Sequence, residues 1–444
     1  MFERILRQGL VLTSAGFKRL DIAIAEGIIQ EMAETVTGST IFEEDLSTYH
    51  LFPGAIDSHV HFNEPGREAW EGIETGSGAL VAGGGSSFFD MPLNSHPPLL
   101  DQETFKLKER LMLQKSYADF ALWGGLTPRN LDKLPELATC GVIGFKAFMS
   151  HSGIAEFERA DGLDLLEGMR IAADLNLPVA VHAESEALTS VLTERLRAKG
   201  ETSIEAYLKS RPVIAELEAI ERALLFAKDS KVKLHIVHVS SPQGLELIDK
   251  AKAEGVNVSA ETCSHYLLFN EDDLKARGAI LKCAPPLRSQ ALQQQMWHKL
   301  KTGNIDILAS DHSPSSLDLK ESDDFFNIWG GVAGVEHSFL ALLKAAPQHG
   351  LDAEFISQAF SFNVAKRFKL ATKGQLSQGY DADIAVIDLA DLALVSQETQ
   401  HSRHRFSPYQ GFNLSKVKAL YIRGQLAFSQ QGLHKIKPQR LKIA

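Results

Sequence analysis

Cysteines, long apolar runs and basic runs are all scarce in this sequence. The three cysteines, Cys140, Cys263 and Cys283, stand far apart in a chain of 444 residues. An odd and scattered set excludes a disulfide framework and favours a reducing, cytoplasmic setting. No run of about 18 apolar residues is present, and the N-terminus lacks the apolar core of a signal peptide, so we expect no membrane span.

Positive charge is not concentrated in any stretch either. The chain has 46 Lys and Arg against 56 Asp and Glu, a formal net charge of −10, and no Lys/Arg-rich run. Nucleic acid and anionic membranes are therefore poor partners. The composition, 44% hydrophobic and 23% charged, is that of a globular protein long enough for one large domain and a smaller one.

Between residues 53 and 374, apolar strand-like runs alternate with helical patterns. The strand candidates are the run that leads to His61, and residues 87–91, 119–123, 142–148, 179–183, 234–239, 256–261 and 305–311. Residues 212–228 are typical of a helix, with Pro212 in its first turn. Eight such units predict an α/β fold, a closed (β/α)8 TIM-like barrel over 53–374.

Short strand patterns fill both ends of the chain. They lie at 9–13, 19–24 and 27–32 near the start, and at 379–388 and 416–428 near the end, where Arg423-Gly424 is typical of a hairpin turn. The N-terminal segment is too small to bury a core alone. We therefore predict that residues 1–52 and 375–444 form one small, discontinuous β-sandwich domain.

Side chains that bind metals recur where the barrel strands end, which is where such barrels place their active sites. These candidates are His59, His61, Lys146, His182, His238 and Asp311. Imidazole and carboxylate suit Zn²⁺ and similar ions, and four histidines with one aspartate exceed what one open tetrahedral site uses. Two ions about 3.5–4 Å apart, with a bridging ligand, fit this set.

Each candidate also has an ordinary structural interpretation. His182 and His238 end apolar runs and could be buried structural histidines, and Asp311 could cap a helix. A protonated Lys146 would repel two cations by several kcal/mol. A lysine that has reacted with CO₂ is an anionic carbamate that can bridge both ions, a change that the sequence does not show. The joint placement of the set favours the metal site.

The order HxH, Lys, His, His, Asp resembles the cyclic amidohydrolases of the amidohydrolase superfamily, which include dihydroorotases, hydantoinases and allantoinases. Neighbouring motifs are similar to those of the allantoinases. They are DSHVHFNEPGR at 57–67, DMPLNS at 90–95, SRP at 210–212, HVSSP at 238–242, ETCSHY at 261–266, KCAPPLR at 282–288, SDHSP at 310–314 and WGGVAG at 329–334. The resemblance covers nearly the whole chain. Ser264 replaces a usual proline and Ala284 a frequent serine, and neither change removes a ligand.

The resemblance implies a binuclear centre of two divalent ions. One ion would be held by His59, His61, N6-carboxylated Lys146 and Asp311, and the other by Lys146, His182 and His238. Zn²⁺ is the expected metal, and Co²⁺, Mn²⁺ or Ni²⁺ suit the same ligands. A metal-activated hydroxide would open the ring of a small ureide, allantoin, to allantoate, with Asp311 as general base and then acid. The implied substrate contacts are Asn63, Asn94, Ala284, Ser313 and Gly331, and the implied assembly is a homotetramer.

Two positions separate the allantoinases from their relatives. Dihydroorotases typically place an arginine two residues after the second histidine to pair with a carboxylate, whereas Asn63 here suits a neutral ureide. Hydantoinases typically carry a tyrosine shortly after the bridging lysine, and residues 148–151 contain none. A hydantoinase or dihydropyrimidinase is the alternative function. A non-catalytic structural relative is disfavoured, because such proteins usually lose metal ligands.

Overall fold

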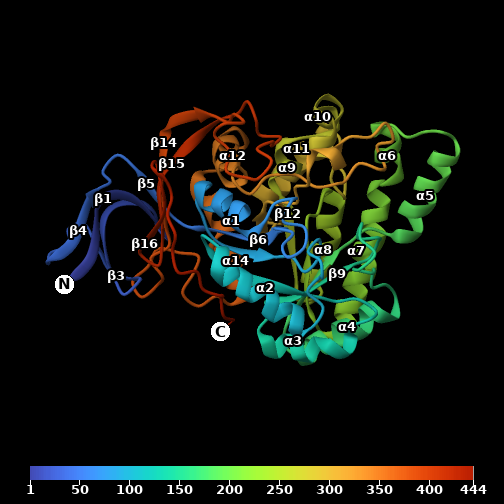
Figure 1. Cartoon of the computed structure of the whole chain (residues 1–444), viewed down its shortest axis with the longest axis horizontal. Coiled ribbons are helices and arrows are strands. Elements are labelled where there is room, and N and C mark those ends of the chain that lie inside the picture. Colours follow the sequence, from blue (N-terminus) through green and yellow to red (C-terminus); the bar gives the residue numbers. More distant parts are fainter. Residues whose placement is uncertain (444) are drawn as a thin grey trace.

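The computed structural model describes residues 1–443, which form a parallel barrel beside a separate β layer (Figure 1). The barrel sheet has eight strands in sequence order, and every neighbouring pair is parallel. Its strands are β6 (Ala55–Val60), β7 (Gly85–Asp90), β8 (Asp119–Gly125), β9 (Gly144–Phe148), β10 (Pro178–His182), β11 (Lys233–Ile236), β12 (Val258–Cys263) and β13 (Ile307–Ala309). This order is that of a (β/α)8 barrel, so the predicted fold is confirmed.

The barrel closes where its last strand meets its first. Val60, at the end of β6, forms a parallel bridge with His312, which follows β13. The backbone N–H of His61 donates to the His312 carbonyl at 2.7 Å. This closure places Asp311 beside the two histidines of the HxH motif.

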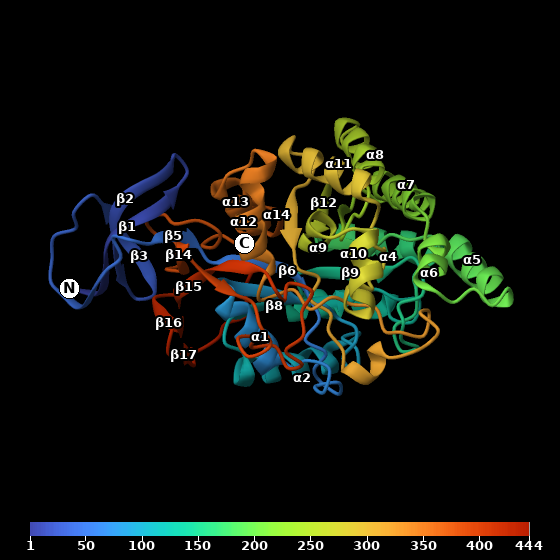
Figure 2. The ribbon, with the colours of Figure 1, turned by 90° about the horizontal axis from the view of Figure 1, so that it is seen from above.

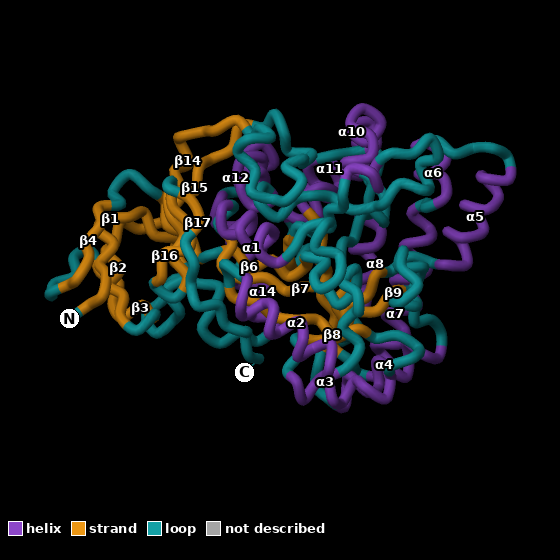
Figure 3. The backbone as a smooth tube through the Cα atoms, viewed as in Figure 1, coloured by secondary structure: helices purple, strands orange, loops and turns teal. Residues whose placement is uncertain are grey.

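Helices cover the outside of the barrel (Figure 3). They are α1 (Ile73–Ala82), α2 (Gln102–Lys115), α3 (Leu134–Cys140), α4 (Leu163–Asp174), α5 (Glu186–Ala198), α6 (Ile204–Ser210), α7 (Val213–Ser230), α8 (Pro242–Ala253), α9 (Ser264–Leu268), α10 (Glu271–Arg277), α11 (Gln290–Lys301), α12 (Ser338–Ala345), α13 (Ala353–Phe360) and α14 (Phe362–Phe368). Four short 3₁₀ turns lie among them, η1 (Leu131–Lys133), η2 (Gly278–Leu281), η3 (Leu317–Lys320) and η4 (Ala346–His349). None of the described helices is long and apolar enough to cross a membrane.

Helix α7 shows how the sequence pattern sets this packing. Pro212, which the sequence predicts in the first turn, is its N-cap, and the helix begins one residue later at Val213. Ile220 and Leu224, four residues apart, are buried in the main core cluster together with Leu234 of β11. The apolar stripe therefore faces the barrel, as the helical spacing predicts.

Strands from both chain ends build the β layer, as the sequence predicts (Figure 2). They are β1 (Phe2–Thr13), β2 (Gly16–Ala25), β3 (Ile28–Ala33), β4 (Thr40–Asp45), β5 (His50–Pro53), β14 (Ile384–Leu394), β15 (Asn413–Ile422), β16 (Gln425–Ser429) and β17 (Gly432–Leu433). All nine strands belong to one continuous mixed sheet, in which β5 joins β1 to β14. The boundaries 1–52, 53–374 and 375–444 stay predictions.

Alternate residues of β14 pack on opposite sides of this sheet. Ile384 and Val386 belong to the layer's own core cluster. Ala385 and Ile387 belong to the large cluster that fills the barrel and its helices. Because side chains alternate along a strand, one face of β14 packs in the core of the β layer and the other face packs against the barrel.

Two barrel strands end two or more residues earlier than their apolar runs predict. The runs 234–239 and 305–311 are strands only over β11 and β13. Two residues beyond these ends, His238 and Asp311 have positive φ angles of 41° and 45°. Residues other than glycine rarely adopt this left-handed backbone conformation, and positions where they do are often functional.

Candidate metal centre

A cavity of about 570 Å³ lies against the residues that follow the barrel strands. Nine of the predicted site residues line it: His59, His61, Asn94, His182, His238, Ala284, Asp311, Ser313 and Gly331. The other two, Lys146 and Asn63, are buried, with 0% and 1% of their surface exposed. The fold thus gathers residues from β6, β10, β11 and the end of β13 around one space.

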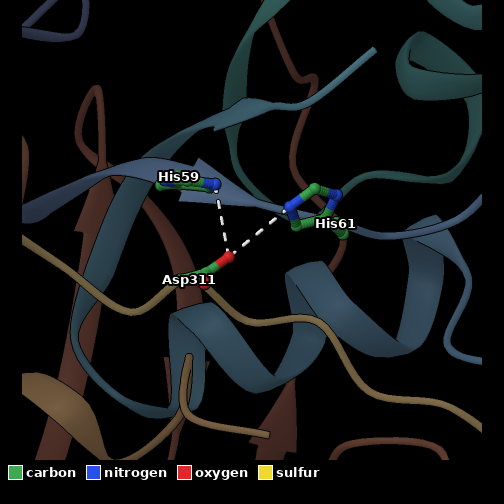
Figure 4. Close-up of side chains that lie close together, drawn as sticks. All are labelled: His59, His61 and Asp311. Carbon is green, nitrogen blue, oxygen red and sulfur yellow. Dashed lines mark ion pairs between the residues drawn. The ribbon is translucent and has the colours of Figure 1, made fainter. Parts of the chain in front are cut away.

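His59, His61 and Asp311 point toward one another (Figure 4). Asp311 Oδ1 lies 3.2 Å from His59 Nε2 and 3.5 Å from His61 Nε2. One ligand atom from each of the three residues lies within 4.8 Å of the other two, a separation expected of atoms that share one ion. Cys263 and His265 form a second group of this size with the same Asp311.

Glu261 orients His59 toward Asp311. Its Oε1 lies 2.9 Å from His59 Nδ1, and in the tautomer in which Nδ1–H donates to this carboxylate, the lone pair of Nε2 faces the Asp311 oxygen. Two electron-pair donors at this distance repel each other unless a cation lies between them, so the residues present fit a metal ion.

His182 and His238 form a second pair of facing nitrogens. His182 Nε2 donates to Glu184 Oε2 at 2.9 Å, which leaves Nδ1 with its lone pair. That Nδ1 lies 3.0 Å from His238 Nε2. The His238 ring is also 5.5 Å from the His59 ring, centroid to centroid, so the two groups adjoin.

Lys146 lies in the middle of β9, rather than at the strand end that the sequence indicates. Its Nζ has no hydrogen-bond partner among the described residues and sits 4.9 Å from the centre of the Phe148 ring. Burial lowers the pKa of this amine to about 7, although the negative charge of Asp311 opposes the shift. A buried amine without a partner is an orphaned polar group, and its conversion to a carbamate would supply a ligand in its place.

The acid–base states of the site suit a cation. Burial lowers the pKa of His61, His182 and His238, so these rings are neutral. Burial alone would raise the pKa of Asp311, but His59 and His61 hold it at about 2. The site therefore offers neutral imidazoles and an ionised carboxylate, which is the form in which these groups bind metal.

Two asparagines near the histidines carry free amide oxygens. Asn63 donates through Nδ2 to the Pro314 carbonyl at 3.2 Å, and Asn94 Nδ2 lies 3.4 Å from His61 Nδ1. The Oδ1 atoms of both asparagines are buried and have no hydrogen-bond partner in the described chain. Each can accept an N–H from a ligand.

The sequence pattern did not identify three supporting residues. Glu261 holds His59, Glu184 holds His182, and Arg211 pairs with Glu184. The signal that could have found the two glutamates is the one used for the ligands, a carboxylate at or just past a strand end.

Comparison with known proteins agrees with the family resemblance found in the sequence. The allantoinase of Deinococcus radiodurans is 49% identical over 425 residues, which are 95% of this chain and 94% of that protein. The allantoinase of Solibacter usitatus is 48% identical and covers 97% and 94%. The structure of an L-hydantoinase from Arthrobacter aurescens superposes with a TM-score of 0.96 at 30% identity and covers 100% of both chains. A profile of the amidohydrolase family matches residues 50–427, and the chain therefore belongs to that family.

Proposed function

We propose that this protein hydrolyses the cyclic amide of allantoin to give allantoate. The observation that carries this function is the similarity to curated allantoinases, which are 36–49% identical over nearly the whole chain. The protein is a metal-dependent hydrolase of cyclic amides. Asn63, in place of an arginine, agrees with a substrate that has no carboxylate.

Six residues would hold two divalent ions, for which Zn²⁺ is the proposed metal. They are His59, His61, Asp311 and a carboxylated Lys146 for one ion, with Lys146, His182 and His238 for the other. The close approach of Asp311 to His59, the 3.0 Å separation of the His182 and His238 nitrogens and the unpartnered Lys146 amine support this set. When bound, such ions polarise the amide carbonyl and lower the pKa of water to about 7.

Asp311 is the proposed catalytic residue. Its carboxylate is ionised and lies in the cavity, so it can take a proton from the attacking water. The same carboxylic acid then gives that proton to the ring nitrogen that leaves. The free amide oxygens of Asn63 and Asn94 would accept N–H groups of the ureide, and Ala284, Ser313 and Gly331 would contact it along the cavity wall.

An assay on allantoin, with Asp311→Asn as the variant, tests this proposal. We expect wild-type protein to form allantoate, and the variant to retain metal but lose about 10²–10⁴ in kcat, because a positioned proton acceptor contributes that much. Elemental analysis should find about two ions per wild-type chain. Near-wild-type turnover by Asp311→Asn would contradict the proton-transfer role, and one ion per chain with a harmless Lys146→Ala would contradict the bridged pair.

A hydantoinase activity is the second candidate. The structural similarity to the Arthrobacter L-hydantoinase, at a TM-score of 0.96, favours it. Tyr207 lines the cavity, but its hydroxyl donates to the Cys283 carbonyl at 2.8 Å, so it is already engaged. A higher kcat/KM for hydantoin or dihydrouracil than for allantoin would establish this alternative.

Cytoplasmic location is proposed from the three scattered cysteines, and a homotetramer is proposed from the family resemblance. Light scattering after size-exclusion chromatography measures the assembly directly. A monomer at micromolar concentration would contradict the tetramer.

A further inference from the structure

One wall of the cavity is a segment without regular secondary structure, which we call the strap and define as residues 325–331. It follows η3, and it runs from Phe325 to Gly331. Its residues Ile328, Trp329 and Gly330 line the cavity together with Gly331, one of the proposed substrate contacts. The shape of this wall therefore depends on what holds the strap.

Lys282 holds the first half of the strap. Its side chain donates through Nζ to the carbonyls of Phe325 at 2.6 Å and Phe326 at 3.2 Å, and also to that of Ile328. Only 4% of Lys282 is exposed. An ammonium has three N–H donors, and here three carbonyls receive them.

Lys320 holds the second half in the same way. Its Nζ donates to the carbonyls of Trp329 at 2.9 Å and Gly331 at 2.7 Å, and 6% of Lys320 is exposed. The two lysines come from different places, Lys282 from the end of η2 and Lys320 from the end of η3. Together they engage five carbonyls within seven residues of chain.

Neither lysine is neutralised by an acid. Within residues 1–443 the hydrogen-bond acceptors of both amines are backbone carbonyls, and neither amine forms an ion pair. Burial of an amine away from water is costly unless hydrogen-bond partners replace its hydration, and here backbone carbonyls do so. A methionine would fill the same volume without that cost, so the hydrogen bonds of the two amines serve the geometry of the strap.

The remaining contacts show that this geometry is tight. Gly331 donates its N–H to the Lys282 carbonyl at 2.7 Å. A Cβ at Gly331, where φ is +141°, would lie 1.9 Å from the Ser313 carbonyl oxygen. Arg197 of α5, which also lines the cavity, donates to Asp324 just before the strap at 2.9 Å and to Asn327 within it. Gly331 and Ser313 can contact a ligand together only while the strap keeps this path.

We propose that Lys282 and Lys320 are positioning residues that set substrate affinity by fixing the strap against the cavity. This inference rests on the proposed function for the identity of the substrate. The two lysines do not act on the reacting atoms. Their removal should therefore weaken binding of the ureide in its ground state and transition state alike, and leave the chemical step nearly intact.

The test combines kinetics with hydrogen exchange on the full-length holoenzyme. For Lys282→Met and for Lys320→Met we expect KM for allantoin to rise about tenfold and kcat to change less than about threefold. Amide exchange should increase within 325–331 in both variants. Lys282→Gln, which keeps two donors, should lie between wild type and Lys282→Met. Because both lysines act on one strap, KM of the double variant should rise by less than the product of the two single-variant fold-changes.

Lys373→Met is the matched control, because Lys373 is also buried but lies against Asp119 and Asp383, away from the cavity. It should destabilise the protein without a selective rise in exchange at 325–331 and without a change in KM. Wild-type exchange and wild-type KM in both lysine variants would overturn the inference. A drop in kcat at unchanged KM would also overturn it. If wild-type protein fails on allantoin, the proposed function falls, and the exchange data still decide whether the lysines fix the strap.

Discussion

Glu261 is the residue on which the first metal ligand depends. It is fully buried, and its Oε1 accepts from the His59 ring while its Oε2 accepts from Ser58 at 2.7 Å and from His235 at 3.2 Å. The carboxylate thereby fixes both the ring plane and the tautomer of His59. Partners of this kind raise the basicity of a ligating imidazole.

Glu261→Gln should therefore weaken metal binding without unfolding the barrel. The glutamine can still accept from His59, but it has lost the negative charge, and we expect metal affinity or activity to fall about 10–100-fold. Elemental analysis after dialysis against a chelator measures this loss. Glu336→Gln is the control, since Glu336 forms a similar pair with His401 at 2.7 Å outside the cavity. Equal metal loss in both variants would contradict the role of Glu261.

Asp21 gives the β layer a dependence on pH. Burial would raise the pKa of this carboxyl, but the N–H groups of Val36 and Gln8 and the side chain of Arg7 outweigh it, so the pKa is lowered. A lowered pKa contributes stability above the unfolded value of about 3.9, and that stability is lost as the pH falls through the folded value.

Urea unfolding midpoints measured between pH 7 and pH 2 check this dependence. The wild-type midpoint should fall once the pH drops below about 4, and Asp21→Asn should be less stable at pH 7 with a shallower fall. Asp391→Asn is the comparison, because Asp391 pairs with Lys416 at the surface, where such pairs contribute about 0–1 kcal/mol. Parallel curves for wild type and Asp21→Asn would contradict the assignment.

At the scale of single residues, the sequence predicts the proposed metal ligands but not the residues that hold these ligands in place. A histidine at a strand end is visible as a pattern, because strand periodicity and residue type are both local. The contact between Glu261 and His59 joins residues 202 positions apart, and only the closed barrel brings them together. The same holds for the carbonyls that surround Lys282.

Helix α1 shows how an element's composition serves the site. Its sequence, IETGSGALVA, contains two glycines that would lower the stability of an isolated helix. A Cβ at Gly76 would lie 2.4 Å from Cδ1 of Phe62, which stands between His61 and Asn63. The missing side chain lets the helix pack directly on the turn that carries these residues.

Gly76→Ala should therefore destabilise the protein, although alanine is the better helix former. The gain of about 1 kcal/mol in propensity is smaller than the 1–3 kcal/mol expected from overpacking. Displacement of Phe62 should also lower kcat/KM. Gly78→Ala in the same helix meets only the tip of Leu433, which can move, so it should be neutral or slightly stabilising. Urea midpoints and kcat/KM of the two variants decide the comparison.

At the scale of elements, apolar runs predict the eight barrel strands and the hairpin at Arg423-Gly424, because a buried strand needs a continuous apolar stretch. The ends of β11 and β13 are less predictable. His238 and Asp311 leave the sheet in a left-handed conformation that tertiary contacts impose. The strap has no periodicity at all, and its path depends on two lysines elsewhere in the chain.

The barrel and the β layer are joined by a buried charge cluster. Lys373 lies 2.8 Å from Asp119 at the start of β8, 2.9 Å from Asp381 and 2.8 Å from Asp383, just before β14. Arg423, in the turn between β15 and β16, also pairs with Asp119. Three carboxylates against two cations thus connect a barrel strand to the C-terminal strands of the layer.

Removal of Lys373 should weaken the contact between the barrel and the β layer. Burial lowers the pKa of this amine, but the three aspartates outweigh it and raise the pKa above its ordinary value, so its contribution to stability persists until strongly alkaline pH. Lys373→Met leaves the carboxylates without this partner, and we expect a loss of about 3–5 kcal/mol, since one half of a buried pair then remains. Urea unfolding and hydrogen exchange at β14 and β15 measure this loss of stability.

Lys416→Met is the control. It removes an exposed partner of Asp391 and should change stability by less than about 1 kcal/mol. An equally small change in Lys373→Met would mean that apolar packing alone holds the β layer on the barrel.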